Sequence, residues 1–322
     1  MSAGAELGLV NILHKANLKR RERPCAIAMQ EKHYSAFNKP KWAAVLFLLP
    51  GILTFLLFRY YPMVKAIIMS FYDYSIMNPP GKFVGLGNYT RALQDPMVNL
   101  VWKNTATIVG LSLLGFFIPI ILAVLLDEVR GGKVVFRTIY IIPAIMPAMV
   151  TIVLWKWFYN PDYGLLNIIR QGLGAQPLGW LNDPKLAKLC LVLPGFFAPG
   201  YTALIYLAAL QGIPKSMYEA AIIDGAGYWQ KLRYITLPRI VPMMGIMLIM
   251  GLIGAFQMFE APFVYTGGGP LNSTKVVALY IYEEAFNFYR MGYGTTMAVM
   301  LFVFLLVLTW LQVRFFKTDP DS

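Results

Sequence analysis

Few residues in this chain have the types and spacing that covalent chemistry requires. Both histidines, His14 and His33, precede the first long apolar run, and the two cysteines, Cys25 and Cys190, do not lie at ligand spacing from a histidine or from each other. A nucleophile with its base, or a metal with its ligands, needs such groups close together. We therefore predict neither a catalytic residue nor a metal site, and we expect that the chain is not an enzyme.

Nucleotide binding is not predicted for this chain either. The Gly-Gly-Lys at 131–133 lacks the glycine spacing and the following Ser or Thr of a phosphate-binding loop, and the Gly-Gly-Gly at 267–269 is followed by proline. If ATP drives the protein, we expect ATP and Mg²⁺ to be bound by a separate chain, with no cofactor in this one.

The most informative spacing lies in a polar segment, residues 211–238, between two apolar runs. Ser216 followed three residues later by Glu219 has the spacing of a capping box, which predicts a helix start. Gly225 and Gly227 can supply the left-handed turn that ends this helix.

The same segment predicts a second short helix over 228–236. Pro238 and Pro242 then open the next apolar run, where a missing N–H costs little. The result is a pair of short polar helices, a compact element that suits docking into a groove on a partner.

The elements around this segment are predicted to be membrane-spanning helices. Of the 322 residues, 58% are hydrophobic and 14% are charged, against about 45–50% and about 25% in a soluble domain. Six apolar runs of roughly 18–24 residues each can cross a ~30 Å hydrocarbon core as helices. They are Trp42–Pro62, Asn104–Leu126, Thr138–Phe158, Leu186–Ala209, Ile240–Phe259 and Thr296–Val313.

The placement of Lys and Arg favours a cytoplasmic location for both termini, because the segments that would face inward are richer in these residues. The formal net charge of +12 is attributed mainly to these loops, so nucleic acid is not an expected partner. We expect a basic cytoplasmic tail over 1–41, the first span with a periplasmic loop over 42–100, a core with five spans over 101–316, and a cytoplasmic tail over 317–322.

Proline and glycine interrupt several spans, most densely in the fourth, which contains Pro194-Gly195 and Pro199-Gly200. Ordinary kinks with close helix packing and interrupted helices that line a cavity are both open for this span. For the other spans ordinary kinks are favoured.

Candidate residues for the path of a polar solute lie in the fourth and fifth spans. Phe196, Phe197 and Tyr201 could form an aromatic wall, although for each phenylalanine taken alone lipid or helix packing is the favoured explanation. Phe256, Gln257 and Glu260 follow in the fifth span, and the last two, three residues apart, would share one helix face. An interhelical hydrogen bond for the amide and an outer-interface position for the carboxylate are the alternatives.

The polar segment resembles the EAA loop of the inner-membrane permeases of binding-protein-dependent ABC importers. The resemblance rests on the sequences EAA at 219–221, DGAG at 224–227 and ITLP at 235–238. It implies coupling helices that sit in a cleft of an ATP-binding subunit. The implied coupling residues are Glu219, Ala220, Ala221, Asp224, Gly225, Ala226, Gly227, Leu237 and Pro238.

Further segments are similar to carbohydrate permeases of the maltose and glycerol-phosphate type. They are YP at 61–62, SF at 70–71, FVGLGNY at 83–89 and TGGGP at 266–270, so the likeness runs from about Leu46 to the C-terminus. Many relatives carry a Trp early in the fourth span where this chain reads LPGFF at 193–197, so substrate contacts on this helix cannot simply be transferred.

The resemblance implies an all-α integral membrane protein with six transmembrane helices, the type I ABC importer permease fold and a cytoplasmic coupling-helix loop. It also implies a bacterial inner membrane location, a second homologous permease, two ATP-binding subunits, an external solute-binding protein and transport by alternating access. The expected substrate is a carbohydrate, with an acidic oligosaccharide such as alginate as a candidate. The alternative is an ion-coupled secondary sugar carrier, which would need intramembrane acids or bases, and few are found.

Overall fold

A computed structural model describes residues 41–129 and 131–315. Contacts divide the chain into two compact units, Met1–Val64 and Lys65–Ser322, and each is considered by itself. Nearly all of the predicted N-terminal tail, together with the C-terminal tail, lies outside the described residues.

The described part of the first unit is a single helical run. It consists of α2 (Lys41–Phe55) and the π-helical turn η1 (Leu56–Tyr60), and α3 (Tyr61–Met69) continues it across the division. The run from Val45 to Met69 is long and apolar enough to cross a membrane, so the first predicted span is confirmed and extended. Pro50 lies inside α2 without ending it.

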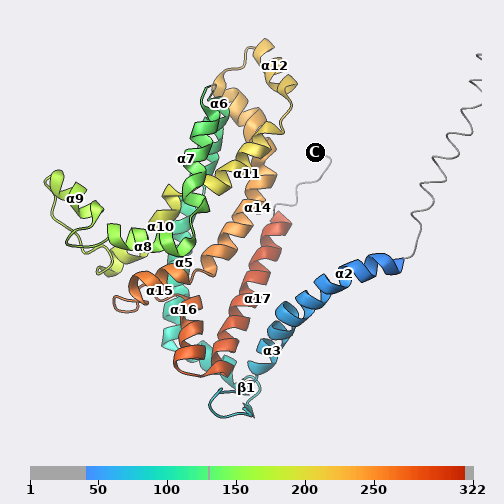
Figure 1. Ribbon diagram of the computed structural model, residues 1–322, viewed down its shortest axis with the longest axis vertical. Helices are drawn as coiled ribbons and strands as arrows, with labels where there is room; N and C mark the ends of the chain where they lie inside the picture. Colours follow the sequence, from blue (N-terminus) through green and yellow to red (C-terminus); the bar gives the residue numbers. More distant parts are fainter. Residues whose placement is uncertain (1–40, 130, 316–322) are drawn as a thin grey trace, which may run out of the picture. The chain divides into compact units, whose positions relative to one another are not determined.

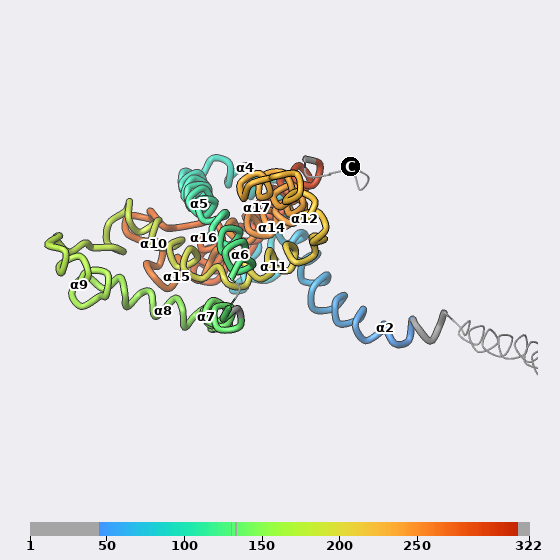
Figure 2. Tube along the Cα trace, turned by 90° about the horizontal axis from the view of Figure 1, so that it is seen from above, coloured from blue at the N-terminus to red at the C-terminus, as the bar shows by residue number. Residues whose placement is uncertain are grey.

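The second unit is a set of helices with one very short hairpin (Figures 1 and 2). Its strands β1 (Tyr72–Asp73) and β2 (Lys82–Phe83) pair antiparallel, with Tyr72 opposite Phe83. The helices are α4 (Gly87–Gln94), α5 (Pro96–Leu114), α6 (Ile118–Glu128), α7 (Lys133–Ile145), α8 (Ala148–Phe158), α9 (Leu165–Gly172), α10 (Pro184–Phe197), α11 (Gly200–Gln211), α12 (Lys215–Ile223), α13 (Tyr228–Lys231), η2 (Leu232–Thr236), α14 (Leu237–Phe256), α15 (Glu260–Thr266), α16 (Val277–Tyr282), η3 (Glu283–Asn287) and α17 (Met291–Phe315).

Membrane-length helices account for every predicted span. Within the described residues four helices are long and apolar enough to cross a membrane, and two bent pairs raise the number to six. The pair α7–α8 bends by 92° before Pro147, and the pair α10–α11 bends by 44° at Pro199. An interrupted fourth span, one of two open interpretations, is therefore found, whereas the ordinary kink favoured for the third span is wrong.

Prolines explain these interruptions, because each lacks the N–H that would continue the helical hydrogen-bond ladder. Pro194 shows how the freed group is satisfied. The carbonyl of Cys190, four residues earlier, accepts a hydrogen bond from the Tyr159 hydroxyl at 3.0 Å. A polar atom that the proline would have left without a partner is thus paired from a neighbouring segment.

Three apolar clusters hold the second unit together. One joins α4, α5, α14, α16 and α17, and a second joins α5, α8, α10, α15 and α16. The third joins α6, α11 and the start of α14, with α12 packed against it. In Figure 2, α9 lies apart from the helices gathered around α14.

Candidate functional site

The helix that carries the EAA sequence, α12, begins and ends differently from its predicted form. It starts at Lys215 after Pro214, and no side chain caps it, so the predicted Ser216–Glu219 capping box is wrong. Pro214 already fixes the entry geometry, and its carbonyl accepts the N–H of Met217 at 3.2 Å. The predicted helix itself is present.

The C-terminal end of α12 is a Schellman turn built on one glycine. Gly225 has φ +77°, the left-handed conformation that glycine adopts at no steric cost. The N–H of Ala226 donates to the Ala221 carbonyl at 2.8 Å, and the N–H of Gly225 donates to Ile222 at 3.0 Å, which is the bonding pattern of this motif. Gly227 has φ −69°, so its predicted left-handed role is wrong.

Gly227 instead precedes the next helix, and its N–H donates to the Gln230 side-chain oxygen at 2.7 Å. The predicted second short helix is not a separate element. Residues of α13 continue through the π-helical turn η2 into α14. The stretch from Tyr228 to Thr266 is long and apolar enough to be one candidate membrane span. Pro238 lies in the first turn of α14 as predicted, while Pro242 lies inside that helix.

The α12 helix has one face in the protein and one face exposed. Met217 and Tyr218 pack against the third apolar cluster, and the Tyr218 hydroxyl is 2.9 Å from the Thr236 hydroxyl in η2. Glu219 is exposed, and Ile223 is 86% exposed. Movement of α12 would therefore be passed to α6, α11 and α14 through packed side chains.

The other residues implied for coupling surround this helix. Ala220, Asp224 and Pro238 are exposed, as are both glycines of the turn, whereas Ala221, Ala226 and Leu237 are half-buried. Figure 1 shows α12 at one end of the unit and α16 at the other. The loop that contains α12 therefore lies at one end of α11 and α14, the helices that it connects.

A cavity of about 680 Å³ lies beside the breaks between α5 and α6 and between α10 and α11. Its walls come from α5, α6, α10, α11 and α14, including the breaks at 115–117 and 198–199. Phe116, Phe196 and Tyr201 contribute rings, and Ser112 and Thr202 contribute hydroxyls. Such a wall can contact both the C–H faces and the hydroxyls of a sugar.

The structure brings together only some of the predicted path residues. Phe196 and Tyr201 line this cavity, but Phe197 points elsewhere, with its ring centroid 5.5 Å from that of Trp155. Phe256 is buried beside Phe304, with ring centroids 5.0 Å apart. The three rings of the fourth span do not form one wall, because the chain changes direction between α10 and α11.

Gln257 and Glu260 do not share a helix face. Phe256 is the last residue of α14, and Glu260 is the first residue of α15. Phe259 between them has φ −128°, outside the helical range. Both polar side chains are exposed, and neither lines the cavity between the helix pairs.

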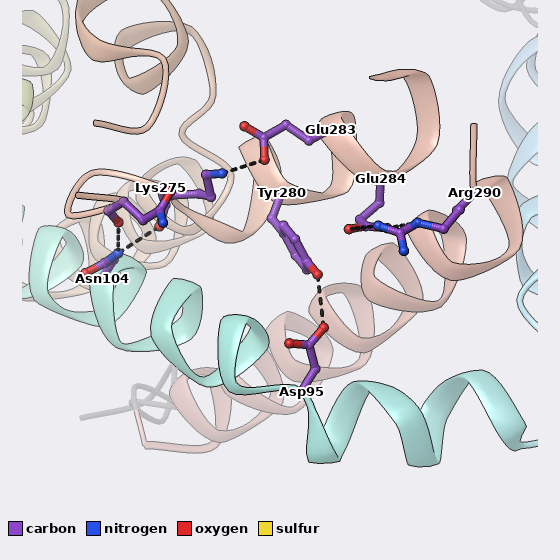
Figure 3. Close-up of polar contacts among 8 residues, drawn as sticks. Asp95, Asn104, Lys275, Tyr280, Glu283, Glu284 and Arg290 are labelled. Atoms are coloured by element: carbon purple, nitrogen blue, oxygen red, sulfur yellow. Dashed lines mark hydrogen bonds and ion pairs between the residues drawn. The ribbon is translucent and has the colours of Figure 1, made fainter. Parts of the chain in front are cut away.

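A network of polar side chains braces the loop between α15 and α16 (Figure 3). Asn104, 2% exposed on α5, donates to the carbonyls of Asn272 and Lys275 at 2.8 and 3.0 Å. The Lys275 ammonium lies 2.8 Å from the Glu283 carboxylate. These contacts attach the loop to both α5 and η3.

Asp95 joins three further elements. One carboxylate oxygen accepts the Met97 N–H at 2.8 Å, which caps α5. The other accepts the hydroxyls of Tyr280 and Tyr293 at 3.1 and 2.9 Å. Burial alone would raise the pKa of Asp95, but these hydrogen bonds outweigh it and hold the pKa below its usual value.

An ion pair between an exposed arginine and a buried glutamate completes the network. Arg290 places Nη2 and Nε each 2.8 Å from the two carboxylate oxygens of Glu284, which is 2% exposed. Tyr289, next to the arginine, has φ +56°. Sequence reasoning missed this network because its partners lie up to 198 residues apart, and no motif marks them.

Residues 115–318 match the family described as "Binding-protein-dependent transport system inner membrane component". The chain is 35% identical over 291 residues to a probable ABC transporter permease protein, YurN, of Bacillus subtilis, which covers 88% of this chain and 99% of the relative. It is 34% identical to the trehalose/maltose transport system permease protein MalF of Thermococcus litoralis, over 85% of this chain and 94% of the relative.

Solved structures agree with this assignment. A crystal structure of a bacterial ABC transporter involved in the import of the acidic polysaccharide alginate contains a chain that superposes with TM-score 0.79 and 27% identity, over 90% of this chain and all of that chain. A second, of an alginate ABC transporter in complex with an alginate pentasaccharide-bound periplasmic protein, gives TM-score 0.78 and 29% identity, over 86% and 96%.

The fold and the exposed helical loop thus define the membrane-embedded component of a transport complex. The chain belongs to the binding-protein-dependent transport system inner membrane component family, and it is a multi-pass inner-membrane permease of the ABC importer type. The predicted fold class and family are confirmed.

Proposed function

We propose that this chain is one permease subunit of an ATP-driven importer that moves a carbohydrate by alternating access. The observation that carries the proposal is the two-sided placement of α12. Its inner face packs against the helices around the cavity, and its outer face presents Glu219 and Ile223 to a partner. A partner that moves α12 would therefore change the walls of the cavity.

The partners follow from the family. In the proposal, two ATP-binding subunits, which bind ATP and Mg²⁺, contact α12 here and the equivalent loop of a second permease. The proposal therefore has α12 on the cytoplasmic side, together with both termini. A solute-binding protein delivers the sugar at the other side. Each partner can bias the inward and outward states only by its difference in affinity for them.

The carbohydrate substrate is supported by the cavity and by the relatives. Its rings and hydroxyls suit a sugar, and curated relatives are described as transporting trehalose/maltose, arabinooligosaccharides and lactose. The alginate transporters, which superpose over most of the chain, and a sulfoquinovosyl glycerol permease with 33% identity make an acidic oligosaccharide such as alginate the second candidate.

Reconstitution of the whole complex in proteoliposomes would test the proposal. Ile223→Asp places a charge on the exposed apolar tip of α12, and we expect it to lower sugar uptake and vanadate-sensitive ATP hydrolysis by about tenfold or more. Solute capture by the binding protein should not change. Ile76→Asp, a matched change at an exposed isoleucine between β1 and β2, should leave uptake unaffected.

Two results would contradict the proposal. Unchanged uptake by the Ile223→Asp complex would show that α12 does not receive the driving motion. Uptake that continues without ATP and follows an ion gradient would instead support a secondary carrier. Supplying neutral and uronate oligosaccharides together, and analysing the vesicle contents by mass spectrometry, would decide the sugar class.

A further inference from the structure

One exposed leucine in the braced loop has a backbone conformation that is uncommon for leucine. Leu271 has φ +51°, and its side chain is 88% exposed. A left-handed backbone is uncommon for a residue other than Gly, Asn or Asp. A large apolar side chain that stays exposed also forgoes the stabilisation that burial would give. Glycine or asparagine at this position would avoid both costs.

The surrounding contacts prevent this loop from relaxing. Asn272, also left-handed at φ +59°, is held through its carbonyl by Asn104. The hydroxyl of Thr274, a fully buried residue, donates to the Gly269 carbonyl at 2.7 Å and lies 2.6 Å from the hydroxyl of Thr266. Strained backbone persists only where its surroundings over-determine it, and such places gather at contact sites.

The loop has a rim that suits a protein contact. Lys275 and Glu283 are paired and mostly buried, so these two charges beside the loop already have a partner. A large apolar side chain that projects from a well-held backbone is a common form of anchor in a protein interface. Because the backbone of the loop is already held in place, less ordering entropy is lost on binding than for a flexible loop.

We infer that Leu271 is a preformed contact for the solute-binding protein, and that Asn104 is the positioning residue that holds it. This inference rests on the proposed function, which places α12 on the ATPase side. The loop joins α15 to α16, and α16 lies at the end of the unit away from α12 (Figure 1). The soluble partner that an importer meets on that side is the protein that delivers the solute.

The test uses the complete complex in proteoliposomes and titrates solute-loaded binding protein against ATP hydrolysis. Leu271→Gly keeps the left-handed backbone and removes the side chain. We expect the concentration for half-maximal stimulation to rise about tenfold, with no loss of thermal stability and an unchanged rate without binding protein. Leu173→Gly, at a leucine that is 81% exposed with φ −92°, is the control and should change nothing.

A double-mutant comparison separates positioning from general stability. Asn104→Ala should raise the half-maximal concentration in the natural background and have no further effect in the L271G background, because both changes remove the same contact. A merely structural role for Asn104 would add to the effect of the second change.

Three outcomes would overturn the inference. The first is an unchanged half-maximal concentration for Leu271→Gly in an intact complex. The second is an equal effect of Leu173→Gly. The third is loss of the association between the two permeases, which would assign Leu271 to that interface. If the natural complex is not stimulated by loaded binding protein at all, the proposed function fails, and this result is recognised before any variant is made.

Discussion

At the scale of single residues, two glycines separated by one residue in the coupling loop have different roles. Gly225 must be left-handed to end α12, whereas Gly227 has a backbone that any residue can adopt. An added Cβ at Gly225 would meet no atom within 4 Å, so only the conformational cost, roughly 1–2 kcal/mol for an ordinary residue, opposes substitution.

This difference predicts an ordered series of transport activities. Gly225→Val should reduce uptake about tenfold, because a β-branched residue disfavours the turn that aims α12. Gly225→Asn should retain most of the activity, since asparagine tolerates the left-handed region, and Gly227→Ala should be nearly silent. Uptake assays on matched expression levels would check the series, and equal losses at both glycines would contradict it.

Asp95 predicts a pH dependence of stability. Its pKa is lower in the folded protein than the usual value of 3.8, so its charged contacts with Met97, Tyr280 and Tyr293 stabilise the fold fully above that value. The contribution is lost as the pH falls through the folded-state pKa.

Asp95→Asn keeps a good helix cap but loses the charge. We expect the variant to be less stable by ~1 kcal/mol at neutral pH, a modest loss because the carboxylate is only half-buried. The difference should shrink below about pH 4. Thermal unfolding of the detergent-solubilised protein over a pH series would measure it, and a difference that grows on acidification would refute the assigned direction.

Features that depend on residues close together in the sequence could be predicted, whereas contacts between distant residues could not. The coupling loop could be located from sequence because its signals lie within thirty residues of each other. The end of α12 could be predicted for Gly225, but the same glycine signal at Gly227 was misleading, since glycine permits a left-handed backbone without requiring it. The Asn104 and Asp95 networks could not be predicted, because they depend on pairings that only the packed fold creates.

At the scale of elements, α7 and α11 approach each other at a single glycine. A Cβ built on Gly200 would overlap the carbonyl oxygen of Tyr140. This backbone cannot move without separating the two helices, and close approach through a small residue is how membrane helices gain packing. The break between α10 and α11 is therefore fixed on both sides.

Gly200→Ala should destabilise the protein by about 1–3 kcal/mol, the usual cost of overpacking. Gly110→Ala is the matched control, because Gly110 lies inside α5 and an added Cβ would meet nothing within 4 Å. The control should be neutral or slightly stabilising through helix propensity. Thermal melts of both variants would decide, and equal behaviour would argue against the close contact.

Element boundaries were harder to predict than element existence. Every apolar run predicted as a span is found, because the length and hydrophobicity of a span can be read from one continuous stretch of sequence. The 92° bend before Pro147 was underestimated, since a proline in a run is compatible with both a kink and a break. The end of α14 at Phe256, which separated Gln257 from Glu260, had no proline or glycine to mark it.

At the scale of the whole molecule, the proposal places α12 and the α15–α16 loop on opposite sides of the membrane. Single cysteines at Ile223 and at Leu271, both highly exposed, can report this if Cys25 and Cys190 are replaced first. We expect a membrane-impermeant maleimide to label L271C in intact cells and to label I223C only after the cells are opened. Labelling of both from outside would invert or remove the proposed orientation.

The unbroken run from Tyr228 into α14 has a mechanical consequence. Twenty-nine residues of helix extend about 43 Å from the turn after α12 to Phe256, so the segment that follows the coupling turn and the cavity wall in α14 belong to one continuous helical run. A π-helical turn such as η2 accommodates one surplus residue. Deletion of the exposed Tyr234 within it would therefore keep the following residues on the same face of the helix. Deletion of Ile246 in α14 would instead rotate the residues that follow it by about 100° about the helix axis and turn their cavity-lining face away from the cavity.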